Sequence, residues 1–134
     1  MSEGAPPAAY QHTAFPQQLV IETTAACNQQ CVFCGRTYMG RPKRSMKRTL
    51  FDKIVEEVGR ENPYAELWPA FMGEAMLLGD RLFDAILYAR KSGCRKITLN
   101  TNGTLVARCA PLVVDTRNAC ANLPPELRGK VMRC

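Results

Sequence analysis

The sequence predicts an α/β fold built from parallel strand–helix units, and two observations predict it. Between residues 18 and 101, segments with the composition of strands alternate with amphipathic segments of helical length. Such alternation is typical of parallel β/α units joined by right-handed crossovers. Unusual polar groups also follow each of the three expected strands, which is where the functional loops of such folds lie. The 134 residues allow one ordinary domain.

The first unit is a strand over residues 18–24 and a helix over residues 49–62. The strand segment is rich in β-branched residues and contains no breaker. The helix is predicted by one stripe of apolar residues at the i, i+3, i+4, i+7 spacing, namely Phe51, Ile54, Val55 and Val58. Thr49 is its expected N-cap and Pro63 its expected stop.

The second unit is a strand over residues 65–72 and a helix over residues 81–92. The strand is apolar but contains Pro69, which weakens the strand pattern. Asp80 is the expected cap of the helix, and Gly93 its expected stop. We expect its buried side to carry Phe83, Ile86, Leu87 and the stem of Arg90.

A third strand is predicted over residues 95–101, followed by an Asn102-Gly103 turn. Beyond Leu105 the pattern is weaker, with a short strand expected over residues 110–115 and a short helix over residues 126–133. The chain therefore divides into an extended or disordered tail (1–17), a β/α core (18–105) and an atypical C-terminal tail (106–134).

The net charge of +6 comes from one segment of the chain. Six bases and no acid lie between Arg36 and Arg48, and without them bases and acids would be equal in number. Such a segment is either a solvated loop or a site that attracts phosphate or nucleic acid. Only one aromatic residue, Tyr38, interleaves with the bases, which argues against nucleic acid as a partner.

The remaining composition argues for a cytoplasmic protein. Apolar residues make up 46% of the chain, but no apolar run is long enough to cross a membrane. Residues 1–18 have neither the basic start nor the apolar stretch of a secretory signal. The lone histidine, His12, lies in the N-terminal tail and is expected to be solvated.

The strongest chemical signal is Cys27-x3-Cys31-x2-Cys34, directly after the first strand. Three thiolates this close can bind three corners of an iron–sulfur cube and leave the fourth iron open. The same spacing could also place three thiols on one helical face. A structural zinc site needs a fourth ligand, and none is nearby. The tail thiols Cys109, Cys120 and Cys134 could be auxiliary cluster ligands, but their wide spacing fits no compact site, and we interpret them as incidental thiols.

This motif, with Phe33 before its last cysteine, resembles the signature of radical S-adenosylmethionine (radical SAM) enzymes. The resemblance implies a partial, TIM-like β/α barrel and a [4Fe-4S] cluster held by Cys27, Cys31 and Cys34. It also implies that the open iron binds the amino and carboxylate groups of S-adenosylmethionine. An electron from the cluster then cleaves the cofactor to a 5′-deoxyadenosyl radical, which takes a hydrogen atom from the substrate. The cofactors supply this chemistry, and the protein orients them.

Two further segments match the family. Met72-Gly73-Glu74-Ala75 resembles its Gly-Gly-Glu-Pro segment, which meets the cofactor's ammonium group, although Met72 and Ala75 depart from the pattern. Thr101-Asn102-Gly103 is similar to the turn after the family's third strand. Phe33, Gly73, Glu74, Thr101 and Asn102 are therefore the expected cofactor-binding residues. Ser45-Met46 is similar to a segment of peptide-modifying members with a SPASM or twitch extension.

The resemblance covers residues 19–105, about three of the family's six β/α units, so we expect a chain that is truncated, frame-shifted or completed by another chain. Two hypotheses follow. The first is an oxidoreductase or maturase that acts on a peptide or small molecule and takes electrons from a flavodoxin or ferredoxin. The second is a non-catalytic iron–sulfur or metal-binding module, or an inactive fragment, whose open strand edges need a partner.

Overall fold

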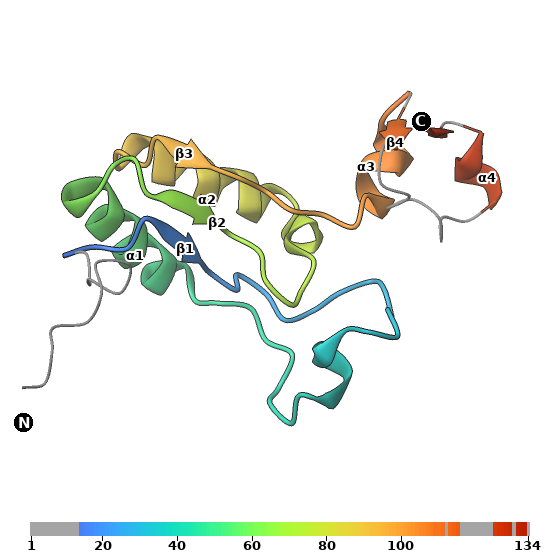
Figure 1. Ribbon diagram of the computed structural model, residues 1–134, viewed down its shortest axis with the longest axis horizontal. Coiled ribbons are helices and arrows are strands. Elements are labelled where there is room, and N and C mark those ends of the chain that lie inside the picture. Colours follow the sequence, from blue (N-terminus) through green and yellow to red (C-terminus); the bar gives the residue numbers. More distant parts are fainter. Residues whose placement is uncertain (1–13, 112, 116–124, 130, 134) are drawn as a thin grey trace, which may run out of the picture.

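The structure is a computed structural model that describes residues 14–111, 113–115, 125–129 and 131–133. Its centre is a parallel sheet of three short strands in the order β1-β2-β3 (Figure 1). These strands are β1 (Gln18–Val20), β2 (Glu66–Trp68) and β3 (Lys96–Ile97). Leu19 lies opposite Leu67, and Leu67 lies opposite Ile97. The α/β prediction is thereby confirmed, with strands shorter than the sequence pattern indicates.

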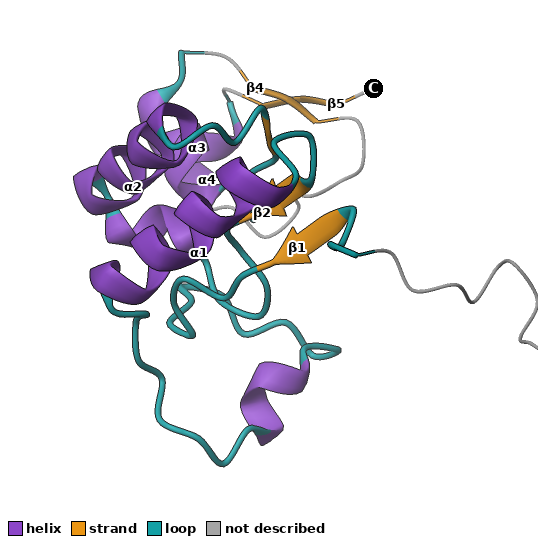
Figure 2. Cartoon of the chain, turned by 90° about the vertical axis from the view of Figure 1, so that its left-hand side faces the viewer, coloured by secondary structure: helices purple, strands orange, loops and turns teal. Residues whose placement is uncertain are grey.

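Two crossover helices, α1 (Arg48–Glu61) and α2 (Asp80–Lys91), lie together on one side of the sheet (Figure 2). On α1 the predicted stripe is confirmed at Phe51, Val55 and Val58, which are buried. The predicted N-cap is wrong. The helix begins at Arg48, so Lys47 is its N-cap and Thr49 lies in its first turn.

The predicted buried side of α2 is wrong at Phe83, Leu87 and Arg90, whereas Ile86 packs against the core. The buried residues of α2 are Leu82, Ala85 and Ala89, whereas Phe83 and Leu87 are 48% and 60% exposed. The small alanines allow α2 to approach the sheet and α1 closely. This close packing, rather than the size of the side chains, decides which face of α2 is buried. Asp80 is the first residue of α2 rather than its cap, which is Gly79.

The core fills the space between the helices and the sheet. Leu67 of β2 is completely buried there, together with Val55, Val58 and Ala65. Cys94 is also part of this core, and its thiol donates to the backbone oxygen of Val55 at 3.4 Å. Burial raises the pKa of the Cys94 thiol, so this cysteine is a packing residue.

The chain beyond β3 differs most from the sequence prediction. A short helix that the sequence did not predict, α3 (Thr104–Cys109), completes a third strand–helix unit. It is followed by β4 (Val113–Asp115), α4 (Pro125–Arg128) and β5 (Val131–Arg133), with β4 and β5 paired in parallel. The helix predicted over 126–133 is therefore wrong in its second half, because those residues pair with β4. His12, Cys120 and Cys134 lie outside the described residues.

None of the helices in the part of the chain that the structure describes is long and apolar enough to cross a membrane.

Candidate functional site

Three loops meet at the carboxyl ends of the three parallel strands, as the sequence predicts. The first follows β1 and carries Cys27, the second follows β2 and carries Gly73-Glu74, and the third follows β3 and carries Thr101-Asn102. All five residues line one pocket of about 170 Å³, together with Ala70, Phe71 and Asn100. Because the strands are parallel and in register, their loops emerge on the same edge of the sheet.

Gly73 lies where a side chain would not fit. A Cβ atom at this position would be 1.9 Å from the backbone oxygen of Thr24 and 2.8 Å from that of Ala26. The next residue, Glu74, donates its backbone N–H to the same Ala26 oxygen at 2.8 Å. The loop after β2 is therefore packed directly on the start of the cysteine loop, and glycine is required for this approach.

Glu74 is a buried acid, 2% exposed, whose carboxylate accepts three hydrogen bonds. One oxygen accepts from the backbone N–H of Met76 at 3.0 Å. The other accepts from the Thr101 hydroxyl at 3.0 Å and from the backbone N–H of Asn102 at 2.8 Å. A buried carboxylate needs such donors, and here they come from its own loop and from the loop after β3.

Asn102 extends this network to the cysteine loop. Its side-chain amide donates to Asn28 at 2.8 Å and lies 3.8 Å from the Cys27 sulfur. Next to it, Gln29 donates to the hydroxyl of Thr104 at 2.8 Å. The sequence alone does not single out Asn28 or Gln29, because contacts between residues some 75 positions apart leave no local signal.

The three cysteines of the motif are free thiols of intermediate exposure. The backbone N–H of Cys34 donates to the oxygen of Cys31 at 3.1 Å, which turns the loop between them. Within the described ranges, no three potential ligand side chains are close enough to hold a metal ion as the loop stands. Cys31, Cys34 and Phe33 do not line the pocket with Glu74, and Phe33 is 89% exposed.

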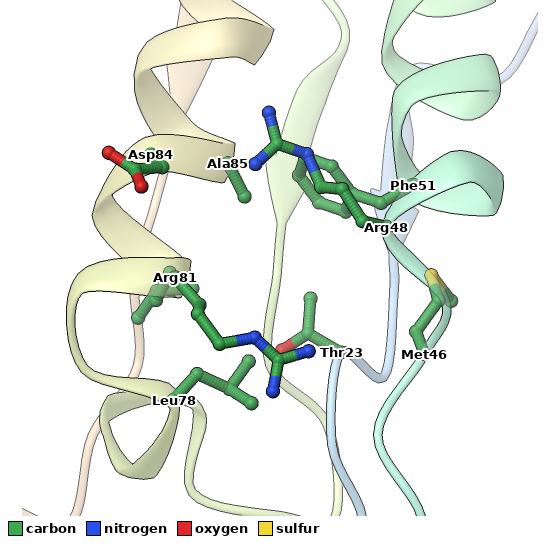
Figure 3. A pocket seen from close by; sticks show the side chains of 9 residues that line it. Thr23, Met46, Arg48, Phe51, Leu78, Arg81, Asp84 and Ala85 are labelled. Carbon is green, nitrogen blue, oxygen red and sulfur yellow. The ribbon is translucent and has the colours of Figure 1, made fainter.

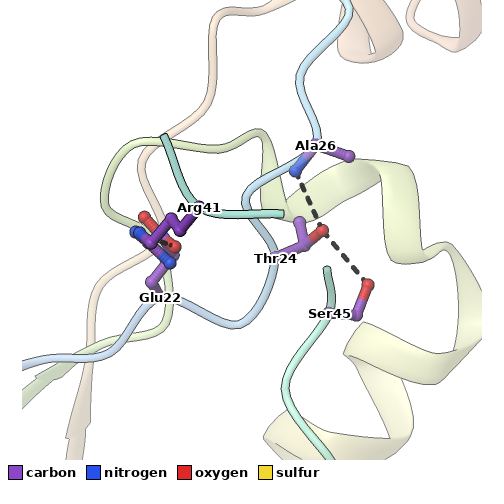
Figure 4. A network of polar contacts seen from close by, with 5 residues as sticks. All are labelled: Glu22, Thr24, Ala26, Arg41 and Ser45. Atoms are coloured by element: carbon purple, nitrogen blue, oxygen red, sulfur yellow. Dashed lines mark hydrogen bonds and ion pairs between the residues drawn. The ribbon is translucent and has the colours of Figure 1, made fainter. Parts of the chain in front are cut away.

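The basic segment 36–48 is anchored against the base of the cysteine loop (Figure 4). Arg41 forms an ion pair with Glu22 at 2.5 Å. Thr24 accepts from the Ser45 hydroxyl at 3.1 Å and from the backbone N–H of Ala26 at 3.2 Å. Arg41 and Ser45 are exposed despite these contacts, as are the other bases of the segment except Arg36, which is buried.

Another pocket, of about 100 Å³, lies between α1 and α2 and contains none of the predicted site residues. Figure 3 shows Arg48 and Phe51 on the α1 side of this pocket and Arg81 on its α2 side. Arg48 already forms an ion pair with Asp52 at 2.6 Å and lies over the ring of Tyr88. Its charge is therefore matched within the two helices.

Comparisons with known proteins agree with the α/β fold. A family model described as the radical SAM superfamily matches residues 21–119. No protein of curated function matches the sequence. The crystal structure of BtrN in complex with AdoMet and 2-DOIA has a similar fold, with a TM-score of 0.60 and 17% sequence identity. The similarity covers 89% of this chain but only 56% of BtrN, so the chain spans little more than half the length of that protein.

Proposed function

The chain belongs to the radical SAM superfamily, and from this premise we propose that it binds a [4Fe-4S] cluster and S-adenosylmethionine at the three loops. Bound together, these groups would supply reductive cleavage of S-adenosylmethionine to a 5′-deoxyadenosyl radical. The observation that carries the proposal is the shared pocket, in which Cys27 of the cysteine loop meets Glu74 and Asn102. The family's fold, a partial β/α barrel, agrees with the three-stranded parallel sheet.

The cysteine loop has the donors that the cluster requires. Cys27, Cys31 and Cys34 are soft sulfur ligands, all free and all partly accessible, and thiolates are the usual ligands of iron–sulfur clusters. They lie on one segment of eight residues that is fixed at its base by the Thr24 and Ala26 contacts. Because metal binding couples to the folding of its ligands, we expect the thiolates to converge when the cluster binds.

Glu74 is the residue that we propose for the cofactor's ammonium group. A carboxylate offers about four lone-pair sites, and the donors from Met76, Thr101 and Asn102 occupy three of them. One acceptor site is left for an ammonium donor in the pocket. The three existing hydrogen bonds would hold the carboxylate in place, so that binding would cost little side-chain entropy.

The size of the pocket limits what these residues can hold. At about 170 Å³, it is smaller than the ~300–1,000 Å³ of typical ligand sites. It would accept the amino-acid end of S-adenosylmethionine and leave the adenosine end to other residues. A peptide or small-molecule substrate and an electron donor such as a flavodoxin or ferredoxin remain part of the proposal.

Anaerobic reconstitution with iron and sulfide tests the cluster assignment. We expect a broad visible absorption and about four irons per chain for the native sequence. The triple variant C27A/C31A/C34A should lose both signals, while Cys109→Ala, which removes an exposed thiol outside the loop, should keep them. Equal iron in the triple variant and the native chain would contradict the assignment. Cluster binding without affinity for S-adenosylmethionine would favour a non-catalytic iron–sulfur module instead.

A further inference from the structure

Arg36 is a buried cation that has no anionic partner in the part of the chain that the structure describes. It is only 6% exposed, although the other bases of segment 36–48 are exposed. One terminal nitrogen of its guanidinium donates to the backbone oxygen of Gln29 at 2.7 Å. Its Nε is buried and makes no hydrogen bond in the structure. Among the described residues, no carboxylate forms an ion pair with it.

A single neutral acceptor does not explain this burial. Removing a charge from water is costly in free energy, and a charged partner with further hydrogen bonds is needed to offset this cost. The backbone oxygen of Gln29 is one neutral dipole. The burial of Arg36 therefore points to an anion that binds next to its guanidinium group.

The position of Arg36 indicates which anion this is. Arg36 belongs to the short 3-10 helix Gly35–Tyr38, which begins directly after Cys34. The carbonyl that it holds, that of Gln29, lies between Cys27 and Cys31 in the chain. Arg36 also lines a pocket of about 370 Å³ together with Cys27 and Lys43. The guanidinium is therefore enclosed by the loop that carries the three thiols.

We propose that Arg36 is the counter-charge of the cluster bound by Cys27, Cys31 and Cys34, an inference that rests on the proposed function. The three thiolates outweigh the positive charge of the cube, so the assembly is an anion and becomes more negative on reduction. Net charge and hydrogen bonds to sulfur set the reduction potentials of such clusters. A buried guanidinium stabilises the reduced state most, and it raises the reduction potential.

The test compares Arg36→Gln with Arg44→Gln, which removes the same charge from an exposed position of the same segment. Each reconstituted protein is titrated with a reductant of known potential, and the reduced cluster is counted by electron paramagnetic resonance. At a fixed potential, Arg36→Gln should lower the ratio of reduced to oxidised cluster roughly tenfold, the scale of losing one hydrogen bond to a charged group. For a one-electron couple this is a shift of about 59 mV. Arg44→Gln should change it little.

Arg36→Lys separates charge from shape. It keeps the cation and loses the planar group, so its ratio should lie between those of the native chain and Arg36→Gln. It also carries the test by itself if Arg36→Gln does not fold, which circular dichroism would show. Equal ratios for Arg36→Gln and Arg44→Gln would overturn the inference and leave the proposed function standing. So would an unchanged ratio with weaker binding of S-adenosylmethionine, because the anionic partner of Arg36 would then be the carboxylate group of the cofactor. If the native chain binds no cluster, both the proposed role of Arg36 and the proposed function are wrong.

Discussion

Glu74→Gln keeps the shape of the buried side chain but removes one acceptor and adds a donor. If the new amide group faces the backbone N–H of Met76, that bond is lost and two donors meet. If it faces the other side, the Thr101 hydroxyl can turn and accept, but the backbone N–H of Asn102 cannot. In either orientation one backbone N–H is left without its acceptor in a site that is 2% exposed.

The loss in the free energy of unfolding of Glu74→Gln follows from this number of unsatisfied donors. One buried donor without a partner costs about 1–3 kcal/mol. The bonds lost here had a charged acceptor, and such bonds are stronger than those between neutral groups. Glu74→Ala leaves all three donors without the carboxylate, and we expect a loss of about 3 kcal/mol, since water that enters the space would satisfy some of them. The proposed ammonium contact adds a second effect, roughly tenfold weaker binding of S-adenosylmethionine by Glu74→Gln.

Urea unfolding and equilibrium binding measure the two effects separately. Glu61→Gln is the matched control, because Glu61 is exposed at the end of α1 and pairs only with its neighbour Arg60. An unfolding free energy for Glu74→Gln within ~0.5 kcal/mol of the control, the usual range for surface changes, would refute the network argument. An unchanged affinity for S-adenosylmethionine in a stably folded variant would refute the ammonium contact.

Three further outcomes are expected. Gly73→Ala should destabilise the fold by about 1–3 kcal/mol in urea unfolding, since its Cβ would lie 1.9 Å from a carbonyl oxygen; Gly40→Ala, where nothing lies within 4 Å, should not. Stability should fall at both ends of the pH range. The hydrogen bond from Thr98 lowers the pKa of Glu66 below 4.5. The stability that the ionised Glu66 contributes is therefore present above pH 4.5 and is lost as the pH falls through the lowered pKa. Burial raises the pKa of Cys94 above 9.0, so its contribution is lost as the pH rises through the raised value; Glu66→Gln should flatten only the acid limb of pH-dependent unfolding. Finally, the chain by itself should release little 5′-deoxyadenosine with a strong reductant, because its pocket holds one end of the cofactor; several turnovers per monomer would contradict this.

The helix α1 and the order of elements could be predicted because their signals are local. Phe51, Val55 and Val58 repeat at helical spacing, and burial follows that repeat. On α2 the same rule selected Phe83 and Leu87 by size, although Ala85 and Ala89 occupy the buried face. Which of two possible stripes faces the core depends on how close the neighbouring elements come, and that distance is not encoded in one helix.

The cysteine motif, Gly73-Glu74 and Thr101-Asn102 could be found because each follows a strand. Their mutual contacts could not be predicted, since the bonds of Asn102 to Glu74 and Asn28 cross 28 and 74 positions of sequence. The burial of Arg36 was hidden for another reason. Its five basic neighbours are exposed, and a charge run averaged over its length predicts solvent for all of its members.

The shortness of the strands gives the polar network a second role. With two or three residues in each strand, sheet hydrogen bonds end well before the loops converge. Beyond the strands, Glu74 also joins the loops by its contacts with Met76 and Asn102, and Asn102 by its contact with Asn28. The atoms that would bind the cofactor are thus among the atoms that keep the carboxyl edge of the sheet together. An ammonium group at Glu74 would complete a network that already exists, so binding at this site should raise the stability of the fold by mass action.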